Sequence, residues 1–176
     1  MKFVEWREDF LAQNNRNNLR GGSFNGSPLY TYKMSALEFS ELQSCLASNL
    51  QTYLKIYDIN DICSRSTEFP ALFVLYAANW WQREYDGTGM SWDPIFTSIG
   101  INYSVLNSNT RSQMIKKGFV YWNLTLNNDI GNLKFIGNIA SQGGLPLKLI
   151  ASDKNGNLNR LLKRTLKEVV GLAFPN

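Results

Sequence analysis

Apolar residues fill nearly every position from Phe69 to Trp81, in the order FPALFVLYAANWW. A surface helix carries one apolar stripe, whereas a helix that is apolar all round has to be buried. Pro70 suits the first turn of a helix, where its missing N–H costs nothing, and the glycines at 87 and 89 suit its end. The pattern therefore predicts a buried central helix over about residues 69–86.

The central helix should supply the core of the protein. Its large apolar side chains cannot remain exposed in water without destabilising the fold. We expect the core to contain Phe73, Leu75, Tyr76 and Trp80.

A second helix is predicted from Ser35. Ser35 and Glu38 match a capping box, in which each side chain binds an exposed backbone N–H of the other residue. Apolar residues follow at helical spacing through Leu54, which indicates a helix of about 20 residues. Cys45 lies on the apolar side of this helix, so we expect a reduced, buried thiol and no disulfide framework.

Helical spacing recurs along the rest of the chain, and the last such segment, from Asn157 to about Leu172, has a leucine face and a basic face. These patterns predict an all-α fold. Minor β content is possible near 145–150, where apolar residues alternate weakly. We expect residues 1–176 to form a single helical domain with a flexible loop over 14–28, rich in Asn and Gly. The chain is either an isolated domain or a module of a longer protein.

Charge is distributed unevenly along the chain. Residues 1–110 carry 8 basic and 11 acidic residues, a net charge of −3, whereas residues 111–176 carry 10 and 3, a net charge of +7. The longest apolar run is too short for a membrane span, which takes about 20 residues. The charged N-terminus does not resemble a signal peptide. We therefore expect a cytoplasmic protein without membrane contact.

The sequence lacks the residues of several common catalytic mechanisms. It has no histidine, which removes Ser-His-Asp catalysis and most zinc sites, and it has no P-loop or GxGxxG motif. We expect no enzymatic activity, no catalytic residue, no bound metal and no cofactor.

A cluster of aromatic and charged residues follows the central helix and is the best candidate site in this region. The rings could stack on a base while Arg83 binds a phosphate or carboxylate. Alternatively, the aromatic residues belong to the core, and Arg83 pairs with a neighbouring acid or a helix C-terminus. A further alternative is a metal-dependent nuclease or other enzyme fragment that uses Glu84, Asp86 and Asp93. The candidate cluster comprises Trp81, Arg83, Glu84, Tyr85, Asp86 and Trp92.

The basic face of the last predicted helix is the candidate site through which we expect the protein to bind nucleic acid or a partner protein. Its four positive charges follow the spacing i, i+3, i+4, i+7, so they share one face. Such a face binds phosphates with little sequence preference, although it can also be an ordinary solvated surface or contact an anionic membrane. The four residues are Arg160, Lys163, Arg164 and Lys167.

Three segments carry a family resemblance: Pro28 to Tyr32, Trp80 to Gly87 with Ser91 and Trp92, and Gly143 to Leu147. In these segments the chain resembles the N-terminal region of large bacterial anti-phage defence proteins that are encoded beside long helicases, of the type III Druantia kind. The resemblance implies a non-catalytic module of a DNA-directed defence assembly. The expected partners are nucleic acid or a protein such as a helicase, and the sequence leaves the oligomeric state open.

Overall fold

Helices make up all the regular structure in the described part of the chain, which confirms the all-α fold. The computed structural model describes residues 2–12, 26–32, 34–89, 91–126, 136–152 and 156. The α-helices are α1 Phe3–Ala12, α2 Ala36–Tyr53, α3 Ile59–Arg65, α4 Glu68–Glu84, α5 Asp93–Ser98, α6 Ser108–Tyr121, α7 Ile136–Gly143 and α8 Leu147–Ser152. Two short 3-10 helices are η2 Leu29–Tyr32 and η3 Tyr103–Val105.

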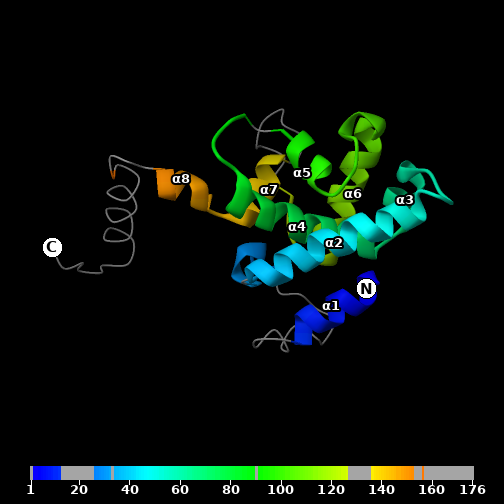
Figure 1. Cartoon of the computed structure of the whole chain (residues 1–176), viewed down its shortest axis with the longest axis horizontal. Coiled ribbons are helices and arrows are strands. Elements are labelled where there is room, and N and C mark those ends of the chain that lie inside the picture. Colours follow the sequence, from blue (N-terminus) through cyan, green and yellow to red (C-terminus); the bar gives the residue numbers. More distant parts are fainter. Residues whose placement is uncertain are drawn as a thin grey trace.

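Helix α4 is the centre of the packing, as its apolar sequence predicts. It runs through the middle of the molecule, with the other helices arranged around it (Figure 1). Phe73, Leu75 and Tyr76 have no exposed surface, which confirms them as core residues. Trp80 is only partly buried, whereas the neighbouring Trp81 is 7% exposed. The expectation for Trp80 is therefore corrected, because α7 covers Trp81 at the end of α4.

Two glycines allow neighbouring helices to approach α4 closely. Gly118 of α6 lies against Val74 and the carbonyl oxygen of Pro70, and Gly143 of α7 lies against Trp81 and the carbonyl oxygen of Ala78. A side chain at either glycine would overlap these atoms. The absence of a Cβ thus determines how near α6 and α7 pack to the central helix.

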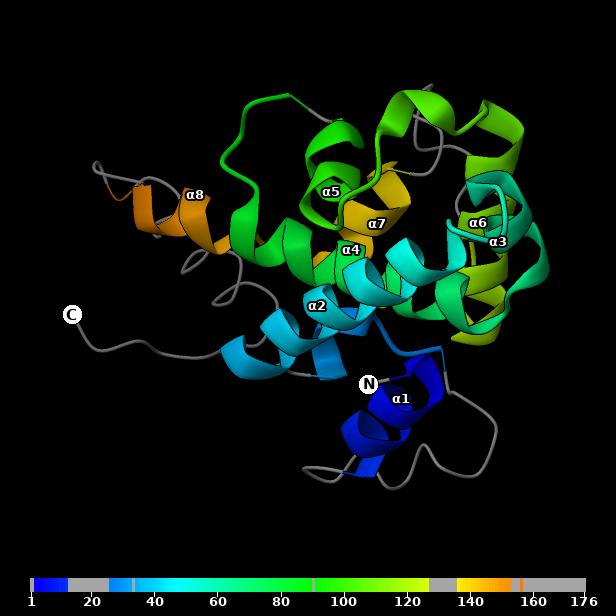
Figure 2. The same cartoon turned by 45° about the vertical axis from the view of Figure 1, so that its right-hand side comes forward.

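Helix α2 begins at the predicted capping box. The Glu38 amide donates to Ser35 Oγ at 3.2 Å, and the Ser35 amide donates to Glu38 Oε2 at 2.7 Å. Leu42, Leu46 and Cys45 are buried on its inner side. The helix runs along the outside of the molecule, on the near side in both Figure 1 and Figure 2.

The possible β content near 145–150 is wrong, because this segment contains helix α8. The Ile150 amide donates to the carbonyl oxygen of Pro146 at 3.2 Å, which is a helical bond. A short apolar run fits a strand and a helix equally well by periodicity, and the proline favours a helix start.

Most of the predicted loop over 14–28 lies outside the described residues. Of the helices that the structure describes, none is long and apolar enough to span a bilayer.

Candidate functional site

The two aromatic residues at the end of α4 form a structural contact. The rings of Trp81 and Tyr85 stack with centroids 3.9 Å apart. The Trp81 indole N–H donates to the carbonyl oxygen of Gly144 at 3.2 Å, which ties α4 to the segment after α7. Trp81 is thus a core residue with a satisfied polar atom, as the structural alternative for this cluster predicts.

Arg83 binds within the fold. Its guanidinium group donates to the carbonyl oxygen of Met34, which precedes α2, and lies 5.3 Å from the centroid of the Phe39 ring. No ion pair joins Arg83 to Glu84 or Asp86 in the described residues. The cation therefore fastens the start of α2 to the end of α4, through contacts that the sequence did not indicate.

The three carboxylates of the metal-site alternative have separate surroundings. Glu84 Oε2 accepts from Lys148 Nζ at 2.7 Å, while Asp86 accepts from the Thr88 hydroxyl at 2.6 Å and from the Thr88 amide at 2.9 Å. These Thr88 bonds lower the pKa of Asp86, because they stabilise its charged form. Asp93 is exposed at the start of α5. Within the described ranges, no three His, Cys, Asp or Glu side chains form a group that could hold a metal ion.

Trp92 belongs to a different aromatic group from Trp81. It is 8% exposed and packs against Phe73 of α4 and Phe96 of α5, with ring centroids 6.2 and 5.9 Å away. The predicted cluster is thus divided between the end of α4 and the core below α5. The four residues of the predicted basic face, Arg160, Lys163, Arg164 and Lys167, lie outside the described residues.

Both cysteines are free, buried thiols, as expected for Cys45. Burial raises the pKa of Cys45, and it raises the pKa of Cys63 to about 12, with a further contribution from the negative charge of Asp58. A thiol attacks as its thiolate, so these protonated side chains are poor nucleophiles near neutral pH.

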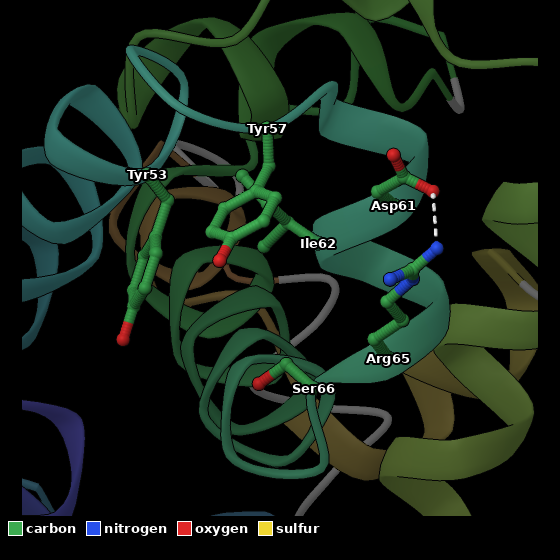
Figure 3. Close-up of a pocket in the computed structure, with 6 residues that line it drawn as sticks. All are labelled: Tyr53, Tyr57, Asp61, Ile62, Arg65 and Ser66. Carbon is green, nitrogen blue, oxygen red and sulfur yellow. Dashed lines mark ion pairs between the residues drawn. The ribbon is translucent and has the colours of Figure 1, made fainter.

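A hollow between the end of α2 and α3 is the candidate site that the sequence analysis missed. It has a volume of about 340 Å³, and Figure 3 shows the Tyr57 ring close to Ile62, with Tyr53 standing beyond it. The large hydrophobic side chains of the connecting turn are unusually accessible. The exposed fractions are 40% for Tyr53, 41% for Leu54, 71% for Ile56 and 49% for Tyr57.

The charges of the residues near the hollow sum to zero. Asp61 and Arg65 form an ion pair on α3 at 3.7 Å, which is too long for a hydrogen bond. Asp58 caps α3 by accepting from the Asn60 amide at 2.7 Å, and Lys55 is exposed in the same turn. With two cations and two anions, the hollow favours neither an anionic nor a cationic ligand. Its chemistry instead suits an apolar group that enters beside the two tyrosines.

The helical spacing of apolar residues in the sequence gives no indication of this hollow. Tyr53 and Leu54 continue the apolar pattern of α2, so periodicity alone assigns them to the core. The available signal is the density of large apolar residues over 53–57, YLKIY, at the end of the helix and directly before Asp58, a capping residue.

Comparison with known proteins gives a family and one curated relative. The sequence profile of the YjiT N-terminal domain matches residues 1–145. Protein YjiT of Escherichia coli (strain K12) is 31% identical over 154 residues, which cover 85% of this chain and 26% of the relative. The chain thus spans about a quarter of the length of that relative. No solved structure matches the chain significantly.

Proposed function

The chain belongs to the YjiT N-terminal domain family, and we propose that it is a non-catalytic interaction module that binds a partner protein through the hollow between α2 and α3. The observation that carries this proposal is the exposure of Tyr53, Leu54, Ile56 and Tyr57 within one turn. Clustered exposed apolar residues are typical of interaction surfaces, and tyrosine is frequent among residues that dominate binding.

The open shape of the hollow favours a protein side chain over an enclosed small molecule as the bound group. Small-molecule sites commonly have volumes of about 300–1,000 Å³ and bury most of the ligand. This hollow has about 340 Å³ and is open to solvent, with Tyr53 and Tyr57 at its edge and Ile62 in its wall. An apolar side chain of a partner would displace water from the two tyrosines, which are 40% and 49% exposed.

The engagement of the polar side chains at the end of α4 supports a non-catalytic role. Arg83 binds a backbone carbonyl, and Glu84 and Asp86 each bind a neighbouring side chain. Catalytic groups need a shared position from which they can reach one substrate. Our proposal therefore assigns these residues to the stability of the fold.

Anti-phage defence in the cytoplasm is the biological setting that we propose, with a helicase as the protein partner. The support is the resemblance in segments 28–32, 80–92 and 143–147. The free thiols of Cys45 and Cys63 suit a reducing compartment. Deletion of the gene should raise the plating efficiency of a sensitive phage, and reintroduction of the gene should lower it again.

Site-specific photo-crosslinking tests the hollow as a partner site. A photoreactive phenylalanine analogue replaces Tyr57 in one variant and Val120, which is 78% exposed on α6, in a matched control. We expect the 57 variant to form one defined protein product whose crosslinked peptide contains an apolar residue. Tyr53→Ala should reduce this product. The same products from both positions, or none from position 57, would overturn the proposal.

Nucleic-acid binding is a second candidate function, favoured by the +7 charge of residues 111–176 and the spacing of Arg160, Lys163, Arg164 and Lys167. The affinity should fall with salt with a log–log slope of about −0.9 for each phosphate contacted on duplex DNA. Lys163→Glu with Arg164→Glu should weaken binding to all sequences alike.

Fluorescence anisotropy with labelled duplex and single strand measures this binding. Lys116→Glu with Lys117→Glu in α6 is a control with the same change of charge. Equal losses in both double variants would indicate a general charge effect, and no binding at about 50 mM salt would exclude the nucleic-acid function.

A further inference from the structure

The outer face of α2 is almost free of charge, although it is exposed. The helix has two charged residues, and one of them, Glu38, is buried in the capping box, which leaves Glu41. Leu37 is 68% exposed at one end of the face. In both Figure 1 and Figure 2, no other described element lies in front of α2. The core of a protein interface is depleted of charge in the same way.

The hydroxyl groups on this side of α2 bind within the helix. Ser44 Oγ donates to the Ser40 carbonyl at 2.9 Å, Ser48 Oγ to the Ser44 carbonyl at 2.7 Å, and Thr52 Oγ1 to the Ser48 carbonyl at 3.0 Å. Because their protons are already donated, these groups lose little when water is removed. Their small size also allows another helix to approach closely.

An antiparallel pair of α2 helices centred on position 46 would pair residues that are equally far from that position. Ser44 and Ser48 are equally far from this position, as are Glu41 and Gln51, and as are Leu37 and Lys55. Two antiparallel copies of α2 would place each residue of such a pair opposite its counterpart. A two-fold axis generates this arrangement, and two-fold dimers are the commonest protein oligomers.

Charge complementarity favours an antiparallel pair. Glu41 and Lys55 are both exposed, and neither makes an ion pair within the described residues. In an antiparallel pair centred on position 46, Glu41 of one copy would lie opposite Gln51 of the other and about one helical turn from its Lys55, which follows the end of α2, and this contact would occur twice. Leu37, which is 68% exposed, would lie beside the stem of Lys55.

We propose that this chain forms a two-fold homodimer in which the outer faces of two antiparallel α2 helices pack together beside position 46. The inference goes beyond the proposed function, because the dimer contact uses the outer face of α2 and the partner site uses the hollow between α2 and α3. A contact made mainly by one helix from each copy is small, so we expect a dissociation constant in the micromolar range, about 10–100 μM.

Sedimentation equilibrium of the full chain, under reducing conditions and from about 5 to 500 μM, tests the dimer. Glu41→Lys and Lys55→Glu should each weaken association about tenfold, which is 1.4 kcal/mol for the two symmetric contacts together. The double variant, in which the charges are exchanged, should restore the affinity. Asp93→Lys on α5 makes the same change of charge as Glu41→Lys at another exposed position and should have no effect.

Cysteine crosslinking tests the antiparallel register. Ser44→Cys and Ser48→Cys are made separately and then mixed, and oxidation should link the two chains faster in the mixture than in either protein alone, because positions 44 and 48 face each other across the axis. Cys45 and Cys63 are buried, which limits side reactions. A monomer at every concentration, no rescue by the charge exchange, or equal crosslinking of the separate proteins would each overturn the proposal.

Discussion

Gly118 of α6 lies directly against Val74 of α4, with no room for a side chain between the two helices. A Cβ added to Gly118 would overlap Val74 Cγ2 and the carbonyl oxygen of Pro70. This oxygen belongs to the backbone of the central helix, so neither helix can shift without disturbing the surrounding core.

Gly118→Ala should therefore destabilise the protein by about 1–3 kcal/mol. In an exposed helix interior the same change usually stabilises by about 0.5–1 kcal/mol, because alanine restricts the unfolded chain. The measurement is urea denaturation, with Gln113→Ala at an exposed position of α6 as the control. A Gly118→Ala variant as stable as the control would contradict the close approach of α6 to α4.

The two tryptophans at the end of α4 should differ in their contribution to stability. Trp81 is buried, stacks on Tyr85 and donates a hydrogen bond to Gly144, whereas Trp80 is partly buried at the edge of the core. We expect Trp81→Ala to cost about 3–5 kcal/mol and Trp80→Ala about 1–2 kcal/mol. Thermal unfolding followed by circular dichroism measures the loss of stability in each variant. A larger loss of stability in Trp80→Ala than in Trp81→Ala would refute this packing.

The protein should lose stability above pH 9, because Cys63 and Tyr76 resist ionisation. Burial raises the pKa of Cys63 from 9.0 to about 12 and that of Tyr76 from 10.0 to about 12. The unfolded chain releases these protons first, so the stabilisation is complete below pH 9 and is lost as pH rises towards 12. By linkage, Cys63 alone should account for a loss of about 2 kcal/mol near pH 10.5.

Urea denaturation between about pH 8 and 11 measures this loss, since the free energy of unfolding is obtained at each pH. Cys63→Ala lacks the thiol and should lose less stability over the same interval. Parallel pH profiles for the two proteins would show that Cys63 does not contribute.

Helix α8 should depend on packing more than on its ion pair with α4. Glu84 and Lys148 are 2.7 Å apart, but their side chains are 41% and 51% exposed. An exposed pair contributes about 0–1 kcal/mol, so Glu84→Gln should have little effect. Gly87 has a φ of +93°, and a Cβ there would lie 2.9 Å from Leu149 Cδ2. Gly87→Ala should therefore loosen α8.

Hydrogen exchange of the α8 amides distinguishes the two contributions. We expect faster exchange at Ile150 and Ala151 in Gly87→Ala and nearly unchanged exchange in Glu84→Gln. If Glu84→Gln had the larger effect, the ion pair would be the main attachment of α8.

Local patterns in the sequence were sufficient to predict much of the fold. The capping box at Ser35 and Glu38 depends on atoms within one helical turn, and the structure has both of its hydrogen bonds. The burial of α4 follows from composition alone, because every side of that helix is apolar. In contrast, 145–150 fits both a strand and a helix, and only the structure assigned it to α8.

The arrangement of the candidate residues depended on contacts between distant segments. Trp81 and Trp92 are close in sequence, but Gly144 binds one and Phe96 packs against the other. The accessibility of Tyr53 and Tyr57 likewise depends on the turn into α3, because periodicity cannot tell whether another element covers the end of a helix. The sequence by itself determined the capping box of α2 and the burial of α4, since a cap depends on neighbours within one helical turn and α4 is apolar on every side. Only the tertiary structure decided which side chains meet and which stay exposed, because these outcomes depend on residues far apart in the chain.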